Sequence, residues 1–140
     1  MNESATIRLD IPAEHRYLNV LSQCIDAVLA RVDGLADLAT TSYNLQLAAQ
    51  EICTNIVEHA YEGRPQGRIG VTLTLEDGPR RMLIELQDTG RSFDLAAAPE
   101  PNLDDAQVHG YGLFLARSLT DDLGYVAHPH GNHWRLVKYL

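Results

Sequence analysis

The segment that decides the fold lies at residues 51–61 and reads Glu-Ile-Cys-Thr-Asn-Ile-Val-Glu-His-Ala-Tyr. Its apolar residues continue a helical spacing that begins earlier in the chain, so the pattern predicts one amphipathic helix over about residues 41–61. The apolar face of this helix consists of Leu45, Ala49, Ile52, Ile56 and Ala60. The opposite face carries a polar stripe of Glu51, Asn55, Glu58 and Glu62.

Asn55 is the residue of this stripe that suggests a function. Asparagine is a mediocre helix former that prefers caps and turns, yet Asn55 stands inside the helix one turn after Glu51. An amide oxygen and a carboxylate at this spacing can contact one ligand together, and Mg²⁺ accepts oxygen ligands of both kinds. The other interpretation of the stripe is a solvated helix face, which needs no ligand.

The chain on either side of this helix predicts a sheet with further helices. Strands at residues 71–76 and 83–87 flank an Asp-Gly-Pro turn and predict a hairpin. The other expected elements are a strand over residues 4–10, a helix that Pro12 opens and that runs to about residue 31, a short helix over residues 111–120, and strands over residues 124–127 and 133–139. We therefore predict an α+β fold, a two-layer sandwich of a mixed, mostly antiparallel sheet with its helices on one face.

Length and charge restrict the class of protein. The chain has 140 residues, which fits one domain over residues 1–140. Its net charge of −8 disfavours direct binding to nucleic acid, which needs clustered Lys and Arg. We expect no membrane segment, because no apolar run approaches the roughly 20 residues that cross a bilayer. Cys24 and Cys53 stand far apart, and we expect a reduced, cytoplasmic protein.

Two segments that contain glycine are further candidates for a binding site. Asp88-Thr89-Gly90-Arg91-Ser92-Phe93-Asp94 directly follows the second hairpin strand. A carboxylate there can accept a hydrogen bond from an exocyclic amino group such as that of adenine, worth roughly 1.5–3 kcal/mol; an Asx-type turn is the local alternative. Gly110-Tyr111-Gly112-Leu113 opens a helix, where exposed backbone N–H groups suit an anion.

Three histidines near the C-terminus, His128, His130 and His133, form another polar cluster. A zinc site would need more ligands in a fixed frame, and the intervening Pro129 and Gly131 favour a hairpin turn instead.

In this order, the three candidate segments resemble the Bergerat-type (GHKL) ATP-binding fold of gyrase and histidine kinases. The resemblance is closer to the anti-sigma factor serine/threonine kinases of bacterial partner-switching systems. That family has a Glu-x-x-x-Asn helix that continues into His-Ala-Tyr, as in residues 51–61. It also has an Asp-x-Gly-x-x-Phe-Asp box and a Gly-x-Gly-Leu box, as in residues 88–94 and 110–113, and the likeness covers nearly the whole chain.

The resemblance implies a site for ATP and Mg²⁺. Glu51 would be the catalytic base that accepts the proton of a serine or threonine hydroxyl, and Asn55 would hold Mg²⁺. Asp88 would select adenine, with Gly90 giving clearance. The other implied nucleotide-binding residues are Phe93, Gly110, Tyr111, Gly112 and Leu113, with residues 95–109 as a lid over the phosphates.

The resemblance also implies protein partners. The substrate would be a STAS-domain anti-sigma factor antagonist. The sequestered partner would be a sigma factor or a substitute regulator. Members of the family are commonly homodimers, so we expect a homodimer.

The lid departs from the family pattern. Family lids often carry an Arg or Lys that meets the terminal phosphate, but no Arg or Lys lies between Arg91 and Arg117. The lid instead contains Glu100, Asp104 and Asp105. This difference favours an alternative function, a nucleotide-binding module that sequesters a partner without transferring phosphate. A third hypothesis is an α+β interaction domain that binds no nucleotide.

Overall fold

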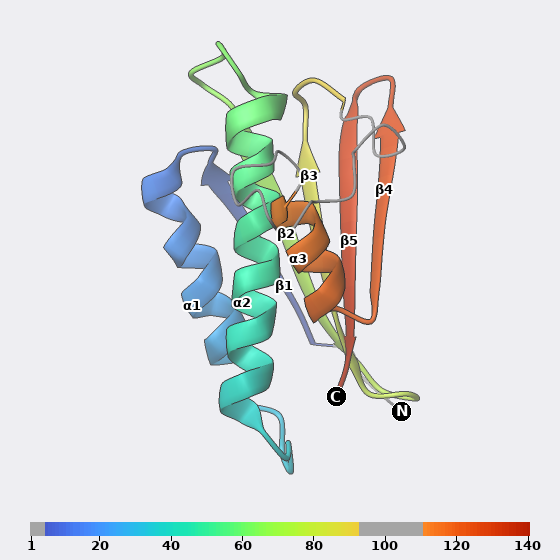
Figure 1. Ribbon diagram of the computed structural model, residues 1–140. Helices are drawn as coiled ribbons and strands as arrows, with labels where there is room; N and C mark the ends of the chain where they lie inside the picture. The colour runs from blue at the N-terminus through green and yellow to red at the C-terminus, as the bar shows by residue number, and fades with distance from the viewer. Residues whose placement is uncertain (1–4, 93–110) are drawn as a thin grey trace.

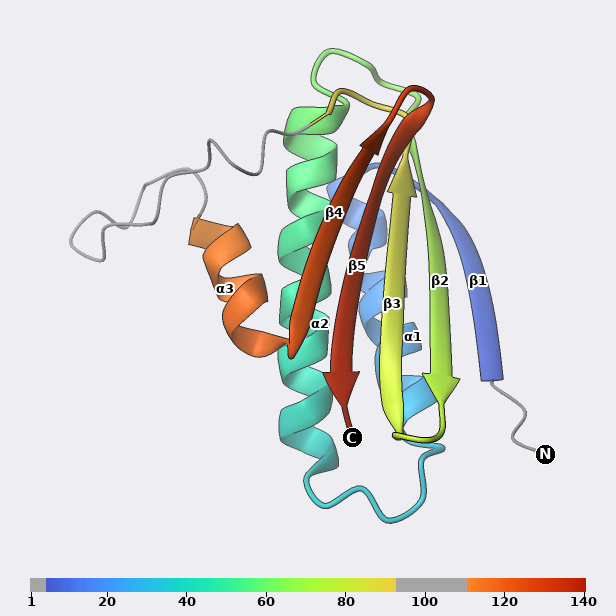
Figure 2. The same ribbon diagram turned by 90° about the vertical axis from the view of Figure 1, so that its right-hand side faces the viewer.

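The computed structural model describes residues 5–92 and 111–140, which form a sheet covered on one face by helices (Figure 1, Figure 2). Phe93, Gly110 and the lid over residues 95–109 lie outside the described residues. The elements are β1 (Ala5–Pro12), the 3-10 turn η1 (His15–Tyr17), α1 (Leu18–Leu29), α2 (Leu38–Asn55), the π-helical segment η2 (Ile56–Ala60), β2 (Arg68–Glu76), β3 (Arg81–Asp88), α3 (Tyr111–Leu119), β4 (Asp122–His128) and β5 (Gly131–Tyr139).

The strands form one sheet in the order β1-β2-β3-β5-β4, and each described pairing is antiparallel. The predicted α+β sandwich is confirmed, although no parallel pair is found within the described residues. The period-2 pattern of the strands explains the register. Directly paired residues place one apolar side chain from each strand in a line across the sheet, namely Ile7, Leu73, Ile84, Leu136 and Leu123.

The core lies between this face of the sheet and the helices. α2 packs against α1 on one side and α3 on the other, as Figure 2 shows in a view onto the face of the sheet. Each of the five residues of the predicted apolar face of α2 and η2 is buried, and Ile52 is 1% exposed. Trp134 of β5 is 2% exposed and packs against the ring of Tyr125 with a centroid distance of 4.4 Å.

The prediction that Pro12 opens a helix is wrong. Pro12 is the last residue of β1 and pairs with Arg68, and α1 begins only at Leu18. β1 is an edge strand of the described sheet, where the missing N–H of proline can be tolerated.

The central helix starts at Leu38, earlier than predicted, because the side chain of Asp37 accepts a hydrogen bond from the Thr40 N–H at 3.1 Å.

The structure has no helix within residues 5–92 and 111–140 that is long and apolar enough to cross a membrane.

Candidate functional site

Glu51 of α2 and Gly112 of α3 form the first half of the candidate site. The two helices pack side by side (Figure 1). A Cβ atom added to Gly112 would overlap Oε2 of Glu51. The glycine therefore leaves room for the carboxylate between the helices. This contact joins two of the three segments that the sequence singled out.

The surroundings of Glu51 favour its protonated form. Burial between the helices raises the pKa of this carboxyl, and the charge of Glu58 on the same polar stripe raises it further. Glu58 itself is exposed and lies 3.5 Å from Nε2 of His15. Glu62, at the end of the stripe, pairs with Arg91. Of the four stripe residues, Glu51 and Asn55 are partly buried, whereas Glu58 and Glu62 are exposed.

Asp88 ends β3 and forms the second half of the site. Its side chain is buried, with 4% of the residue exposed. Oδ1 accepts hydrogen bonds from Nδ2 of Asn132 at 2.8 Å and from the Gly90 N–H at 2.9 Å. Oδ2 is buried and has no hydrogen-bond partner within the described part of the chain. Burial raises the pKa of Asp88, and the bonds from Asn132 and Gly90 oppose that shift.

The segment after Asp88 is bonded to the end of the central helix. The Arg91 N–H donates to the Ala60 carbonyl at 2.7 Å, and a Cβ on Gly90 would overlap that same carbonyl. The Tyr61 hydroxyl accepts the Thr89 N–H at 2.8 Å and donates to the Arg68 carbonyl at 2.7 Å. These bonds hold the segment after Asp88 against Ala60 and Tyr61, which follow the C-terminal end of the helix that carries Asn55. A side chain at position 90 would collide with the Ala60 carbonyl, so packing alone favours glycine there. The resemblance implies a second reason, which is clearance for the ligand.

The family model for histidine kinase-like ATPase domains matches residues 11–138 of this chain. The chain belongs to this family. Membership implies the use of ATP, and it agrees with the resemblance seen in the three polar segments.

Curated relatives in the histidine kinase-like ATPase family are similar to this chain over most of their length. Serine-protein kinase RsbW of Bacillus subtilis strain 168 is 27% identical over 99% of this chain and 88% of its own. RsbW of Listeria monocytogenes serotype 4a strain HCC23 is 32% identical over 100% of this chain and 89% of its own. Serine/threonine-protein kinase BtrW of Bordetella bronchiseptica is 33% identical over 72% of each chain. The chain is a protein kinase of the RsbW group within this family.

Solved structures share the fold. The RsbU and RsbW domains of Rv1364c from Mycobacterium tuberculosis superpose with a TM-score of 0.70 at 18% identity, over 97% of this chain and 32% of that one. A blue-light activated histidine kinase from Erythrobacter litoralis EL346 gives a TM-score of 0.60 at 20% identity, over 93% of this chain and 62% of that one. The predicted Bergerat-type fold is thereby confirmed.

The structure places the predicted site residues in two groups, Glu51 with Gly112 and Asp88 with Gly90. Tyr111 is 40% exposed at the start of α3, whereas Leu113 is 7% exposed and packs in the core. Sequence reasoning missed Asn132, which lies just before the strand predicted over residues 133–139. A signal was present, because Asn132 shares the core-facing positions of β5 with Trp134 and Leu136, where a polar residue is unusual.

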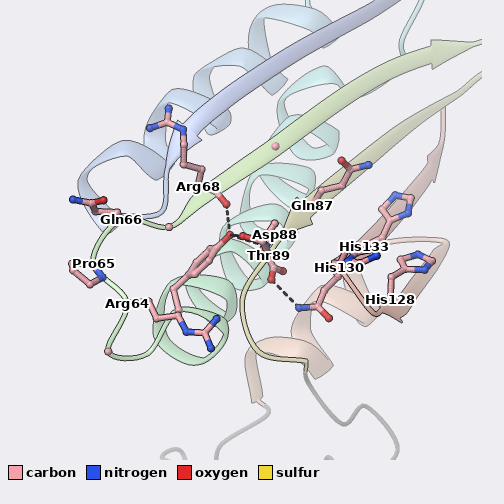
Figure 3. Close-up of a pocket in the computed structure, with 16 residues that line it drawn as sticks. Arg64, Pro65, Gln66, Arg68, Gln87, Asp88, Thr89, His128, His130 and His133 are labelled. Carbon is pink, nitrogen blue, oxygen red and sulfur yellow. Dashed lines mark hydrogen bonds between the residues drawn. The ribbon is translucent and has the colours of Figure 1, made fainter.

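A separate cavity of about 1080 Å³ opens at the end of the sheet where β2 begins and β3 ends (Figure 3). Figure 3 shows Arg64 on one side of it, His128 and His130 on the other, and Asp88 and Thr89 between them. The cavity lining includes Asp88 but not Glu51, Asn55 or Gly112. It is therefore distinct from the contact between Glu51 of α2 and Gly112 of α3.

The histidines near the C-terminus lie on a hairpin, as predicted. His128 pairs with Gly131 at the β4–β5 turn, and Nε2 of His133 lies 3.3 Å from Oε1 of Glu85. Within residues 5–92 and 111–140, no group of three or more His, Cys, Asp or Glu side chains is arranged to hold a metal ion. Cys53 is fully buried, and burial raises the pKa of its thiol to about 12, so this thiol is unreactive at neutral pH.

Proposed function

We propose that this protein is an ATP- and Mg²⁺-dependent serine/threonine kinase that phosphorylates a STAS-domain anti-sigma factor antagonist and sequesters a sigma factor or an equivalent regulator. The relatives named above support a protein kinase of the partner-switching type. The substrate and the sequestered partner come from the resemblance of the motifs. A kinase of this kind works in the cytoplasm, where ATP and sigma factors occur together.

The observation that carries the nucleotide part of this proposal is that Oδ2 of Asp88 has no hydrogen-bond partner among the described residues. A buried carboxylate oxygen without a donor is costly, so a ligand that supplies an N–H group there gains binding energy. The 6-amino group of adenine is such a donor. Guanine has an oxygen at this position and would meet the carboxylate with a second acceptor.

Glu51 and Asn55 have the chemistry that the transfer step requires. Glu51 accepts the proton of the substrate hydroxyl, a role that typically contributes about 10²–10⁴-fold to the rate. Its raised pKa makes it a stronger base than an ordinary exposed carboxylate. Asn55 would hold Mg²⁺ through its amide oxygen, with Glu51 one turn away. When bound, Mg²⁺ neutralises charge on the phosphates.

The first turn of α3 supports the phosphate side of the site. Unpaired backbone N–H groups at a helix N-terminus, together with the helix dipole, attract anions. Gly112 in this turn adds no side chain beside Glu51. The polyphosphate can therefore lie close to both the base and the helix end.

The second candidate function is a nucleotide-binding module that sequesters a partner without transferring phosphate. The absence of Arg and Lys between Arg91 and Arg117 in the sequence favours it. Arg91, at the edge of this segment, already pairs with Glu62.

A transfer assay tests the proposal and separates the two functions. The purified protein is incubated with Mg-ATP and a STAS-domain protein encoded beside it, and the intact mass of that partner is measured. We expect a mass gain of one phosphate that disappears in Glu51→Gln while nucleotide binding remains. Glu76→Gln is the matched control. Glu76 pairs with Arg81 at the end of β2 and β3 that lies farthest from Asp88.

Each result of this assay has a defined meaning. Nucleotide binding without a mass gain for several STAS-domain candidates would favour the sequestering module. Failure to bind any adenine nucleotide would exclude both functions.

We also propose that the protein is a homodimer, as the resemblance implies. Light scattering during size-exclusion chromatography tests this directly. A monomer at all practical concentrations would contradict it.

A further inference from the structure

Asn132 is a buried amide on the apolar face of the sheet. It is 3% exposed, and its neighbours on the same face of β5 are Trp134 and Leu136. An amide in such a place is costly unless it is hydrogen-bonded. Its contacts therefore show why this position is polar.

The side chain of Asn132 has partners for both of its polar atoms. Nδ2 donates to Oδ1 of Asp88 at 2.8 Å, and it also lies 3.2 Å from the Gly90 carbonyl and 3.1 Å from the Arg91 carbonyl. Oδ1 accepts from the Ser92 hydroxyl at 2.9 Å and from the Tyr125 hydroxyl at 3.0 Å. Three acceptors surround the nitrogen and two hydroxyls face the oxygen, so this network defines the orientation of the amide.

This network makes the two oxygens of Asp88 unequal. Among residues 5–92 and 111–140, Oδ1 receives donors from Asn132 and from Gly90, whereas Oδ2 receives none. The bond from Asn132 also favours the ionised carboxylate, against the effect of burial. An ionised carboxylate only accepts hydrogen bonds, whereas a protonated one could donate to a 6-oxo purine.

We propose that Asn132 is a specificity-determining residue of the nucleotide site, which holds Asp88 so that Oδ2 accepts from a 6-amino purine and rejects a 6-oxo purine. Asn132 acts through Asp88 and is a positioning residue, not a catalytic one. This inference rests on the adenine-binding role of Asp88 in the proposed function. It names a residue outside the three segments that carry the family resemblance.

Binding of ADP and of inosine diphosphate tests this role, because hypoxanthine carries an oxygen where adenine carries the 6-amino group. Calorimetry measures both dissociation constants for the full chain in the presence of Mg²⁺. In Asn132→Ala we expect the preference for ADP over inosine diphosphate to fall about tenfold, the loss of roughly one charge-assisted hydrogen bond. Asn132→Asp should lose the preference as well, because two adjacent carboxyl groups share a proton.

The matched controls are Ser92→Ala and Tyr125→Phe. Each removes a donor to Oδ1 of Asn132 and leaves the bond between Asn132 and Asp88 in place. Both should keep the preference for ADP within about twofold, a change below 0.5 kcal/mol. A role of Asn132 in fold stability alone would weaken binding of both nucleotides equally and leave their ratio unchanged.

The outcomes separate this inference from the proposed function. If the wild-type protein prefers ADP and Asp88→Asn loses that preference, but both Asn132 variants keep it, the role of Asn132 is wrong and the proposed function stands. If the wild-type protein binds neither nucleotide, the proposed function fails and this inference fails with it. Should Asn132→Ala not fold, the isosteric Asn132→Asp decides the question.

Discussion

Gly112 of α3 lies directly against the carboxylate of Glu51 on α2, and a side chain at position 112 would displace it. The two residues are far apart in the sequence, so only the packing of α3 on α2 creates this contact. Glycine at position 112 therefore leaves room for this carboxylate, which we propose is the catalytic base.

Gly112→Ala should lower the rate of phosphoryl transfer by about 10²-fold, within the usual contribution of a positioned general base. The added methyl group moves the Glu51 carboxylate from its place. Combined with Glu51→Gln, it should cause little further loss of transfer, because both changes remove the same function. Single-turnover rates with saturating Mg-ATP measure this. Gly124→Ala is the control, since a Cβ there meets no atom within 4 Å.

The pH profile of transfer should reflect the raised pKa of Glu51. A general base is inactive when protonated, so the rate should fall on the acid side at a higher pH than for an ordinary glutamate. Glu58→Gln removes the like charge, lowers the pKa of Glu51 and should shift this acid limb to lower pH. Burial is the larger cause and remains, so the limb should not return fully to the ordinary position. An unchanged limb in Glu58→Gln would argue against Glu51 as the base.

Asp88→Asn should weaken nucleotide binding and raise the stability of the fold at neutral pH. Because burial raises the pKa of Asp88, the folded protein takes up this proton more readily than the unfolded chain does. The unfolding free energy therefore decreases as pH rises through that region, and at neutral pH the ionised group destabilises the fold. The variant should melt about 3 °C higher at neutral pH, with a smaller gain in acid, and should bind ADP about 10–100-fold more weakly. Calorimetric melting curves at several pH values check this.

Tyr61→Phe should destabilise the fold by about 1–2 kcal/mol. The change leaves the Thr89 N–H and the Arg68 carbonyl without the hydroxyl that both contact. Urea denaturation measures the difference. Tyr43→Phe is the control because Tyr43 is 65% exposed, and it should change stability by less than about 0.5 kcal/mol. Equal effects of the two substitutions would refute a structural role of the Tyr61 hydroxyl.

The sequence by itself predicted the order of the helices and strands and singled out the three polar segments, but it did not predict where every helix begins. Apolar side chains repeat every two residues in β2 and at helical spacing in α2, and such patterns are local. The family resemblance then associated Glu51, Asn55 and Asp88 with one site. The start of the first helix was mispredicted at Pro12, because a proline that opens a helix and one that ends an edge strand look alike in sequence.

Only the tertiary structure decided which oxygen of Asp88 lacks a donor in the described part of the chain, and which residues bond to the other oxygen. β5 lies between β3 and β4 and brings Asn132 opposite Asp88, 44 residues away in the chain. In the same way, the packing of α3 on α2 places Gly112 beside Glu51. Strand order and helix packing depend on burial of the whole apolar core, and no local spacing encodes them.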